Sequence, residues 1–188
     1  MRISQENLTQ YVREKIKNNK ILHSKIIIDF PMLLQNDYGL AQDCSLTSMT
    51  ALVQYKKYYP SYSTYQIYDI VEKIALKYGY DGNKKGTYPI FIKKILNEVC
   101  STKSVSTKIL KGIGYNYDTI KEQIDKKNPI ILSLYKSGND SYTNHSVTII
   151  GYIEYNGVRM LAVADNWCKS CSYIDYDELS IISQINYL

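Results

Sequence analysis

Histidine is scarce in this 188-residue chain, which contains only His23 and His145. Because histidine is the most common general base near neutral pH, a histidine-dependent enzyme would have to use one of these two. The chain has four cysteines, too few for a disulfide scaffold at this length. We therefore treat each thiol as a candidate nucleophile, metal ligand or core residue.

Long apolar runs and dense basic runs are also missing. No stretch of eighteen apolar residues exists, and residues 1–7 lack the apolar core of a signal peptide. We expect no transmembrane helix, and either a cytoplasmic protein or one whose secretion signal has been removed. The net charge of +5 is spread over separated lysines, so we do not expect nucleic-acid binding. A modest attraction to anionic wall polymers or membrane surfaces is compatible with this charge.

What the chain does contain is an ordinary apolar fraction of 45% and twenty tyrosines against two phenylalanines and one tryptophan. Tyrosine suits both binding clefts and ordinary half-buried surfaces, and half-buried surfaces are the more common case. The length fits one domain with a sizeable core. We predict a single domain over residues 1–188, made of an N-terminal arm (1–28), a helical half (29–102) and a sheet half (103–188).

This division follows from the change in apolar period along the chain. Helical spacing predicts helices, and alternating or continuous apolar runs predict strands. Asn156-Gly157 is a typical hairpin turn between two of these strands. Helices followed by an antiparallel sheet indicate an α+β fold. The expected helices cover residues 3–18, 44–58, 63–77, 87–99 and 117–126, and the expected strands cover 26–30, 105–110, 129–135, 144–153, 159–164, 172–174 and 182–188.

Cys44 is the best candidate for a nucleophile. The pattern becomes helical at this residue, so its thiol lies in the first turn of a helix, where unpaired N–H groups favour a thiolate. We expect the neighbouring Asp43 to point away from the thiol or to cap the helix. A buried core cysteine is the common alternative for an isolated thiol.

His145 is the candidate base. It lies in a strand that is otherwise mostly apolar, and a structural role is the usual alternative for such a residue. Asp165 ends the next strand, and the two positions are almost symmetric about the turn at Asn156-Gly157. We therefore expect the Asp165 carboxylate to face and orient the imidazole, with Trp167 shielding their hydrogen bond from water. For the oxyanion donor we prefer Gln35 over Gln42, because a nine-residue loop lets it fold back.

Three motifs stand in a familiar order: Gln35 before Asp43-Cys44-Ser45-Leu46-Thr47-Ser48-Met49, then Asn144-His145-Ser146-Val147-Thr148-Ile149-Ile150-Gly151-Tyr152, then Val163-Ala164-Asp165-Asn166-Trp167. They resemble the papain-like cysteine peptidases, and most closely the bacteriocin-processing (C39-like) peptidases. The resemblance implies a papain-like fold with Cys44 as nucleophile, His145 as base, Asp165 as orienting residue and Gln35 as oxyanion donor. Ser45 stands where that family usually has glycine or an acidic residue, and the spacing from Gln35 to Cys44 is longer.

Our leading hypothesis is a bacterial cysteine peptidase or amidase that transfers an acyl group to water through a thioester, with a peptide or peptide-like substrate and no cofactor. The alternative is a catalytically silent papain-like binding module or biosynthetic-cluster partner protein. A third hypothesis concerns Cys168 and Cys171, whose CxxC spacing suits loop thiols, a local disulfide, half of a zinc site or redox chemistry.

Overall fold

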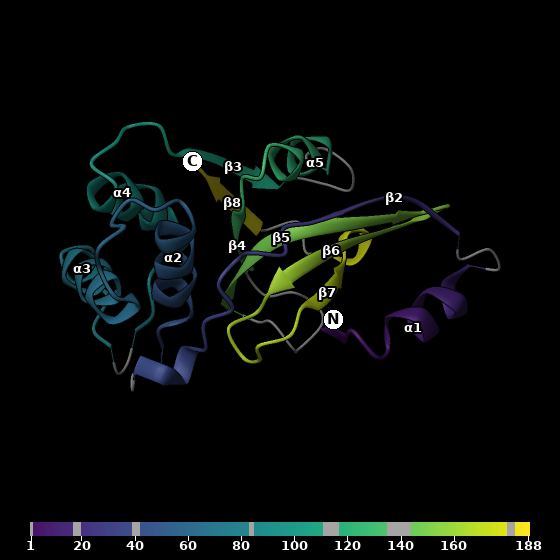
Figure 1. Cartoon of the computed structure of the whole chain (residues 1–188), viewed down its shortest axis with the longest axis horizontal. Coiled ribbons are helices and arrows are strands. Elements are labelled where there is room, and N and C mark those ends of the chain that lie inside the picture. The colour runs from purple at the N-terminus through teal and green to yellow at the C-terminus, as the bar shows by residue number, and fades with distance from the viewer. Residues whose placement is uncertain are drawn as a thin grey trace.

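Helices α2 (Cys44–Tyr55), α3 (Thr64–Leu76) and α4 (Pro89–Val99) lie together on one side of the molecule (Figure 1). The antiparallel sheet extends away from them, with α1 (Leu8–Lys15) and α5 (Tyr117–Asp125) at its margins. This arrangement confirms the predicted α+β class. The computed structural model describes residues 2–16, 20–38, 42–82, 85–110, 117–134, 144–179 and 183–188, without the side chains of Ile109 and Leu110.

Two helices of the helical half begin at local sequence signals. Helix α2 covers Cys44–Tyr55, α3 covers Thr64–Leu76 and α4 covers Pro89–Val99. Ser63 and Gln66 form a capping box at the start of α3, and proline occupies the first position of α4. These three helices agree with the prediction.

Helix α2 is the central element of the molecule. It packs against α3 on one side and against strand β5 (His145–Tyr155) on the other, so residues 45–53 are buried on every face. Leu46, Met49 and Leu52 belong to the core of the helical half, whereas Ala51 belongs to the core of the sheet. The first residue of α2 is thereby fixed at the boundary between the two cores.

The sheet is antiparallel. Among the described residues its order is β1-β7-β6-β5-β4-β8-β3, and β2 pairs with the far end of β5. The remaining strands and helices are β1 (Ile3–Ser4), α1 (Leu8–Lys15), β2 (Ile21–Ile26), η1 (Gln35–Tyr38), β3 (Ser106–Leu110), α5 (Tyr117–Asp125), β4 (Ile130–Leu134), β6 (Val158–Ala164), β7 (Ser172–Asp175), η3 (Tyr176–Glu178) and β8 (Ser183–Tyr187).

Strands β5 and β6 form the expected hairpin. Their turn is Asn156-Gly157, with Gly157 in the left-handed region at φ +90°. An irregularity between Ile149 and Gly151 shifts the register. At Gly151 an added Cβ would lie 2.5 Å from the main-chain oxygen of Lys25, so the absence of a side chain lets β2 approach β5 closely.

The N-terminal arm differs from the prediction. Instead of one helix over 3–18, residues 3–4 form β1 against β7, and α1 begins only at Leu8. Instead of a strand over 26–30, β2 covers Ile21–Ile26 and pairs with β5. The open edges of two distant strands offer backbone hydrogen bonds to this segment, and these long-range pairings override the local pattern.

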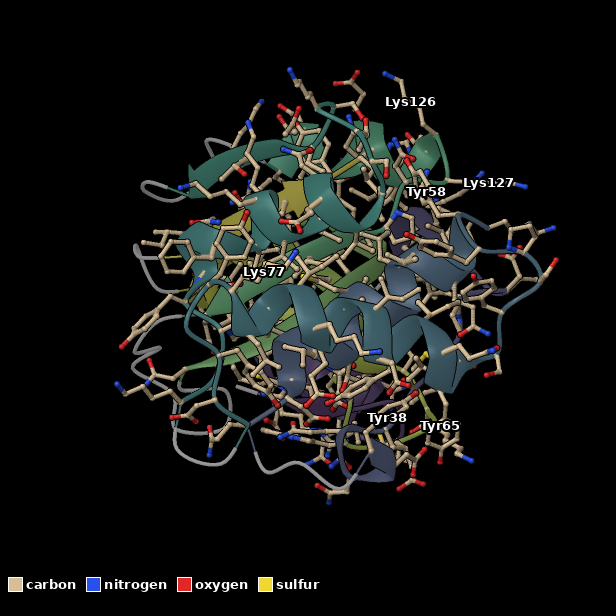
Figure 2. The ribbon with its side chains drawn as sticks, turned by 90° about the vertical axis from the view of Figure 1, so that its left-hand side faces the viewer. Tyr38, Tyr58, Tyr65, Lys77, Lys126 and Lys127 are labelled. Carbon is tan, nitrogen blue, oxygen red and sulfur yellow. The ribbon has the colours of Figure 1, made fainter. Side chains whose placement is uncertain are left out.

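Exposed tyrosines such as Tyr58 and Tyr65 lie on the outer face of the helical half (Figure 2). Tyr38 and Tyr65 lie together there, with ring centroids 5.4 Å apart. Tyr38 also stacks on the buried Tyr68 at 4.0 Å, and the Tyr68 hydroxyl donates to Asp43. Stacked rings therefore connect this surface with the residue that precedes Cys44.

Candidate active site

Cys44 is the first residue of α2, as the sequence predicts, and its thiol is half-buried. Burial raises the pKa of this thiol, whereas hydrogen bonds from the main-chain N–H of Ser146 and from Ser45 lower it. The contact with Ser146 places the thiol beside the residue that follows His145. The start of α2 and the start of β5 therefore meet at the nucleophile.

Asp43 does not cap the helix. Its side chain makes no capping hydrogen bond and is fully buried, where it accepts hydrogen bonds from Tyr68 (3.0 Å) and Thr47 (3.4 Å). Burial raises the pKa of Asp43 to about 6, although these hydrogen bonds act in the opposite direction. The charge of Asp43 also adds to the raised pKa of Cys44.

His145 is the first residue of β5 and is 7% exposed. Its Nε2 lies 2.8 Å from the main-chain oxygen of Asp165. Because a carbonyl oxygen only accepts, Nε2 is the donor in this bond, which leaves Nδ1 as the acceptor of the neutral ring. Burial lowers the pKa of His145, and the bond and charge of Asp165 partly offset this.

The Asp165 carboxylate is engaged differently from the prediction, which expected it to bind the imidazole. One oxygen accepts from Arg2 Nε (2.6 Å) and the Ser172 hydroxyl (2.7 Å). The other accepts from the main-chain N–H groups of Trp167 (3.0 Å) and Cys168 (3.3 Å). The main-chain carbonyl of Asp165, not its carboxylate, is the partner of His145 Nε2.

The register of the hairpin explains this difference. Beyond the irregularity at Ile149, the pairing is Thr148↔Ala164, and its continuation places Trp167 rather than Asp165 opposite His145. The two rings stack with centroids 4.3 Å apart and an interplanar angle of 28°. Trp167 therefore stacks on the imidazole itself, whereas the sequence analysis expected it to shield a bond between the imidazole and the Asp165 carboxylate. Asp165 contacts the ring through its carbonyl.

Asn166 has a role that the sequence analysis missed. It adopts a left-handed conformation at φ +64° and is 3% exposed. Its Nδ2 donates to the main-chain oxygen of Cys44 (3.0 Å), the Ser48 hydroxyl (2.8 Å) and the main-chain oxygen of Ser146 (3.0 Å). One amide thus joins α2, β5 and the turn after β6. Its position between Asp165 and Trp167 was the only available signal.

Cys44 and His145 line one pocket between the two halves. Gln42 lines it as well, whereas Gln35 lies in η1 with its main-chain N–H bonded to the main-chain oxygen of Asn166 (2.8 Å). Both glutamines are therefore close to residues of the site. The other described residues that line the pocket are Ser45, Lys85, Gly86, Thr87, Tyr88, Pro89, Leu134, Asn144 and Ser146.

The two cysteines of the CxxC motif are free thiols in this structure. Cys168 contacts Arg2 and Asp165, and burial raises the pKa of Cys171 to about 11. In the described part of the chain, no group of three or more His, Cys, Asp or Glu side chains is arranged to hold a metal ion. None of the helices described combines the length and apolar character needed to cross a bilayer.

Comparison with known proteins decides the family. The sequence model of the Peptidase C39-like family matches residues 27–184. The chain belongs to this family. A solved mite-allergen structure, from work on the limited antibody cross-reactivity between Blo t 1 and Der p 1, is similar at 13% identity and a TM-score of 0.39, over 93% of this chain and 68% of that one. No protein with curated annotation matches. The family match confirms the resemblance to C39-like peptidases and starts after the first 26 residues.

Proposed function

We propose that this protein is a cysteine-dependent hydrolase that cleaves a peptide or a related amide. The observation that carries the proposal is the shared pocket of Cys44 and His145, in which the bond to the Asp165 carbonyl leaves Nδ1 of the imidazole as the acceptor. A nucleophile and a base held in one cleft, with the base oriented by a third group, are the parts that acyl transfer requires.

In the proposed reaction, His145 accepts the proton of the Cys44 thiol as the sulfur attacks the substrate carbonyl carbon. The tetrahedral intermediate collapses to a thioester when the imidazolium donates that proton to the leaving amine. His145 then takes a proton from water, which attacks the thioester and releases the acid, and the thiol regains its proton. Gln35 is our proposed side-chain donor to the oxyanion.

The electrostatics bear on when the first proton moves. Burial raises the pKa of Cys44 and lowers the pKa of His145, so each charge is disfavoured when it stands alone. We therefore expect thiol and imidazole to be largely neutral in the empty site. Proton transfer then accompanies attack on the substrate, and the reactivity of Cys44 depends strongly on His145.

Alkylation of the thiols tests the proposal. The protein is treated with iodoacetamide near neutral pH, and labelling of each cysteine is followed by peptide mass mapping. Burial raises the pKa of Cys44, and it raises those of Cys100 and Cys171 to about 12 and about 11. We expect Cys44 to react faster than these two thiols because His145 lies in the same pocket and can accept its proton. In His145→Ala the Cys44 rate should fall by about a hundredfold, in line with the loss of a general base.

His23→Ala is the matched control, because His23 is exposed on β2, away from the pocket. This variant should label Cys44 at the wild-type rate. Hydrolysis of a mixed peptide library, lost in Cys44→Ala, completes the test. If Cys44 reacts slowly and independently of His145, the silent binding module replaces the enzyme.

A further inference from the structure

The N-terminal arm lies outside the segment that matches the family, yet it reaches the candidate site. The match starts at residue 27. Strand β1 pairs with β7 in the register Ile3↔Tyr173 and Ser4↔Ser172 and so forms the edge of the sheet, and the buried Ile3 anchors it in the core of the sheet. The residue next to this strand, Arg2, is thereby held beside the turn that follows β6.

Arg2 makes two contacts with that turn. Its Nε donates to Asp165 Oδ2 at 2.6 Å, and its Nη2 donates to the Cys168 sulfur at 3.0 Å. The Asp165 side chain is fully buried, whereas the Arg2 side chain is 32% exposed. A buried carboxylate needs such a partner, because an uncompensated charge in the interior is strongly unfavourable.

Asp165 in turn provides or binds both ring partners described for His145, its own carbonyl and Trp167. Its carbonyl accepts from His145 Nε2, and its carboxylate accepts from the main-chain N–H of Trp167, whose ring stacks on the imidazole. The Cys168 N–H bonds the same carboxylate oxygen. A contact that holds the Asp165 carboxylate in place therefore also holds the carbonyl and the indole ring that orient His145.

We propose that Arg2 is a positioning residue of the active site, through which the arm locks the turn at residues 165–168 and so orients His145. The role in catalysis rests on the proposed function, but the contact between the arm and the turn does not. Arginine suits this task because its planar guanidinium binds two groups in a fixed geometry.

The contact also sets a pH dependence. Burial on its own would raise the pKa of Asp165, but the hydrogen bonds from Arg2, Ser172 and the Trp167 N–H, together with the charge of Arg2, hold it below its usual value. The titratable groups that face the carboxylate are Arg2, His145, Cys168 and Cys171. Without Arg2, the carboxylate should take up a proton at a higher pH on acidification.

Two variants test the positioning role in the full chain. In Arg2→Ala we expect kcat for peptide hydrolysis, or the Cys44 alkylation rate, to fall by about tenfold to a hundredfold, as for a misplaced catalytic group. The acid limb of the pH profile should move to higher pH. Arg2→Lys keeps one donor and the charge but not the fork, so it should restore part of both. Arg13→Ala, which removes an exposed arginine of the same arm, should change neither.

Trp167 provides a readout that does not depend on activity, because it is the only tryptophan of the chain. In Arg2→Ala its emission and its quenching by acrylamide should change, and Ser172→Ala, which removes another donor to the same carboxylate oxygen, should cause a smaller change in the same direction. Wild-type fluorescence and an unmoved acid limb in folded Arg2→Ala would overturn the proposal. If the fluorescence changes but wild-type Cys44 is unreactive, the positioning contact stands and the proposed hydrolase fails.

Discussion

The two halves of the molecule supply the candidate site in different ways. The helical half provides Cys44 as the first residue of one helix, whose position follows from a local sequence signal. The sheet half provides His145 at the start of β5 and the main-chain carbonyl of Asp165 just after β6. These two groups meet only because a hairpin folds twenty residues back on themselves.

The difference lies in how the position of each group is fixed. The thiol is held by a helix buried on all its faces, so its place depends on packing that tolerates little change. The imidazole is held by one carbonyl, one indole ring and the turn that carries both. We therefore expect changes in the sheet half to alter the orientation of the base, and changes in the helical half to alter the charge and stability of the thiol.

We expect the largest loss of activity from substitutions in the loop before α2, because this loop carries both candidate oxyanion donors, Gln35 and Gln42. We expect Gln35→Ala to lower kcat by about a hundredfold, as for the loss of one oxyanion donor. Its main chain is bonded to Asn166, so it bridges the two halves at the site. Gln42 lines the pocket and lies two residues before the nucleophile, so Gln42→Ala should mainly raise KM.

Steady-state kinetics with one cleaved peptide separate these two roles. Gln35→Glu serves as a further control, because it keeps the size of the side chain and removes its N–H donor. A loss of kcat confined to Gln42→Ala would assign the donor to Gln42 and place the oxyanion on the pocket side of the loop.

The next largest effect concerns Asn166, whose amide ties the halves together. In Asn166→Ala the oxygens of Cys44, Ser48 and Ser146 lose a buried donor, which should lower the free energy of unfolding by about 1–3 kcal/mol. Asn166→Gly loses the same bonds but tolerates the left-handed backbone at φ +64°. Urea unfolding should therefore rank wild type above Gly and Gly above Ala.

The order of stability of Asn166→Gly and Asn166→Ala separates the hydrogen bonds of the side chain from the backbone conformation. If both variants are as stable as wild type, the Asn166 amide does not stabilise the contact between the two halves. Equal losses in Gly and Ala would attribute the whole effect to the hydrogen bonds and none to the backbone.

Elements with a local signal were predictable. Helix α3 begins at its capping box, and the β5–β6 hairpin turns at Asn156-Gly157. The arm was not, because β1 and β2 form against strand edges more than a hundred residues away. The contact of His145 with the Asp165 carbonyl was missed for a related reason. The pairing Tyr155↔Val158, continued along the hairpin, places residue 168 opposite His145, and the irregularity near Ile149 moves this to Trp167, so Asp165 is not directly opposite in either register. A contact with a main-chain carbonyl depends on backbone geometry and not on residue type.

The smallest expected effect belongs to Asp43, which tests electrostatics within the helical half alone. Its pKa of about 6 lies above the 3.8 of an ordinary aspartate, so the folded state holds a proton that the unfolded chain has released. The contribution of Asp43 to the free energy of unfolding should therefore fall as the pH rises from about 4 through 6, by roughly 3 kcal/mol, and remain low above that. Asp43→Asn keeps an oxygen for the Tyr68 hydroxyl and has no charge, so it should lack this slope.

Thermal unfolding of both proteins between pH 4 and pH 8 measures the difference, with Asp69→Asn on the exposed side of α3 as control. Because the charge of Asp43 adds to the raised pKa of Cys44, the variant should also alkylate Cys44 somewhat faster, by less than tenfold. Parallel stability curves for wild type and Asp43→Asn would mean that Asp43 stays ionised in the core. The helical half would then hold a buried charge that its hydrogen bonds from Tyr68 and Thr47 fully compensate.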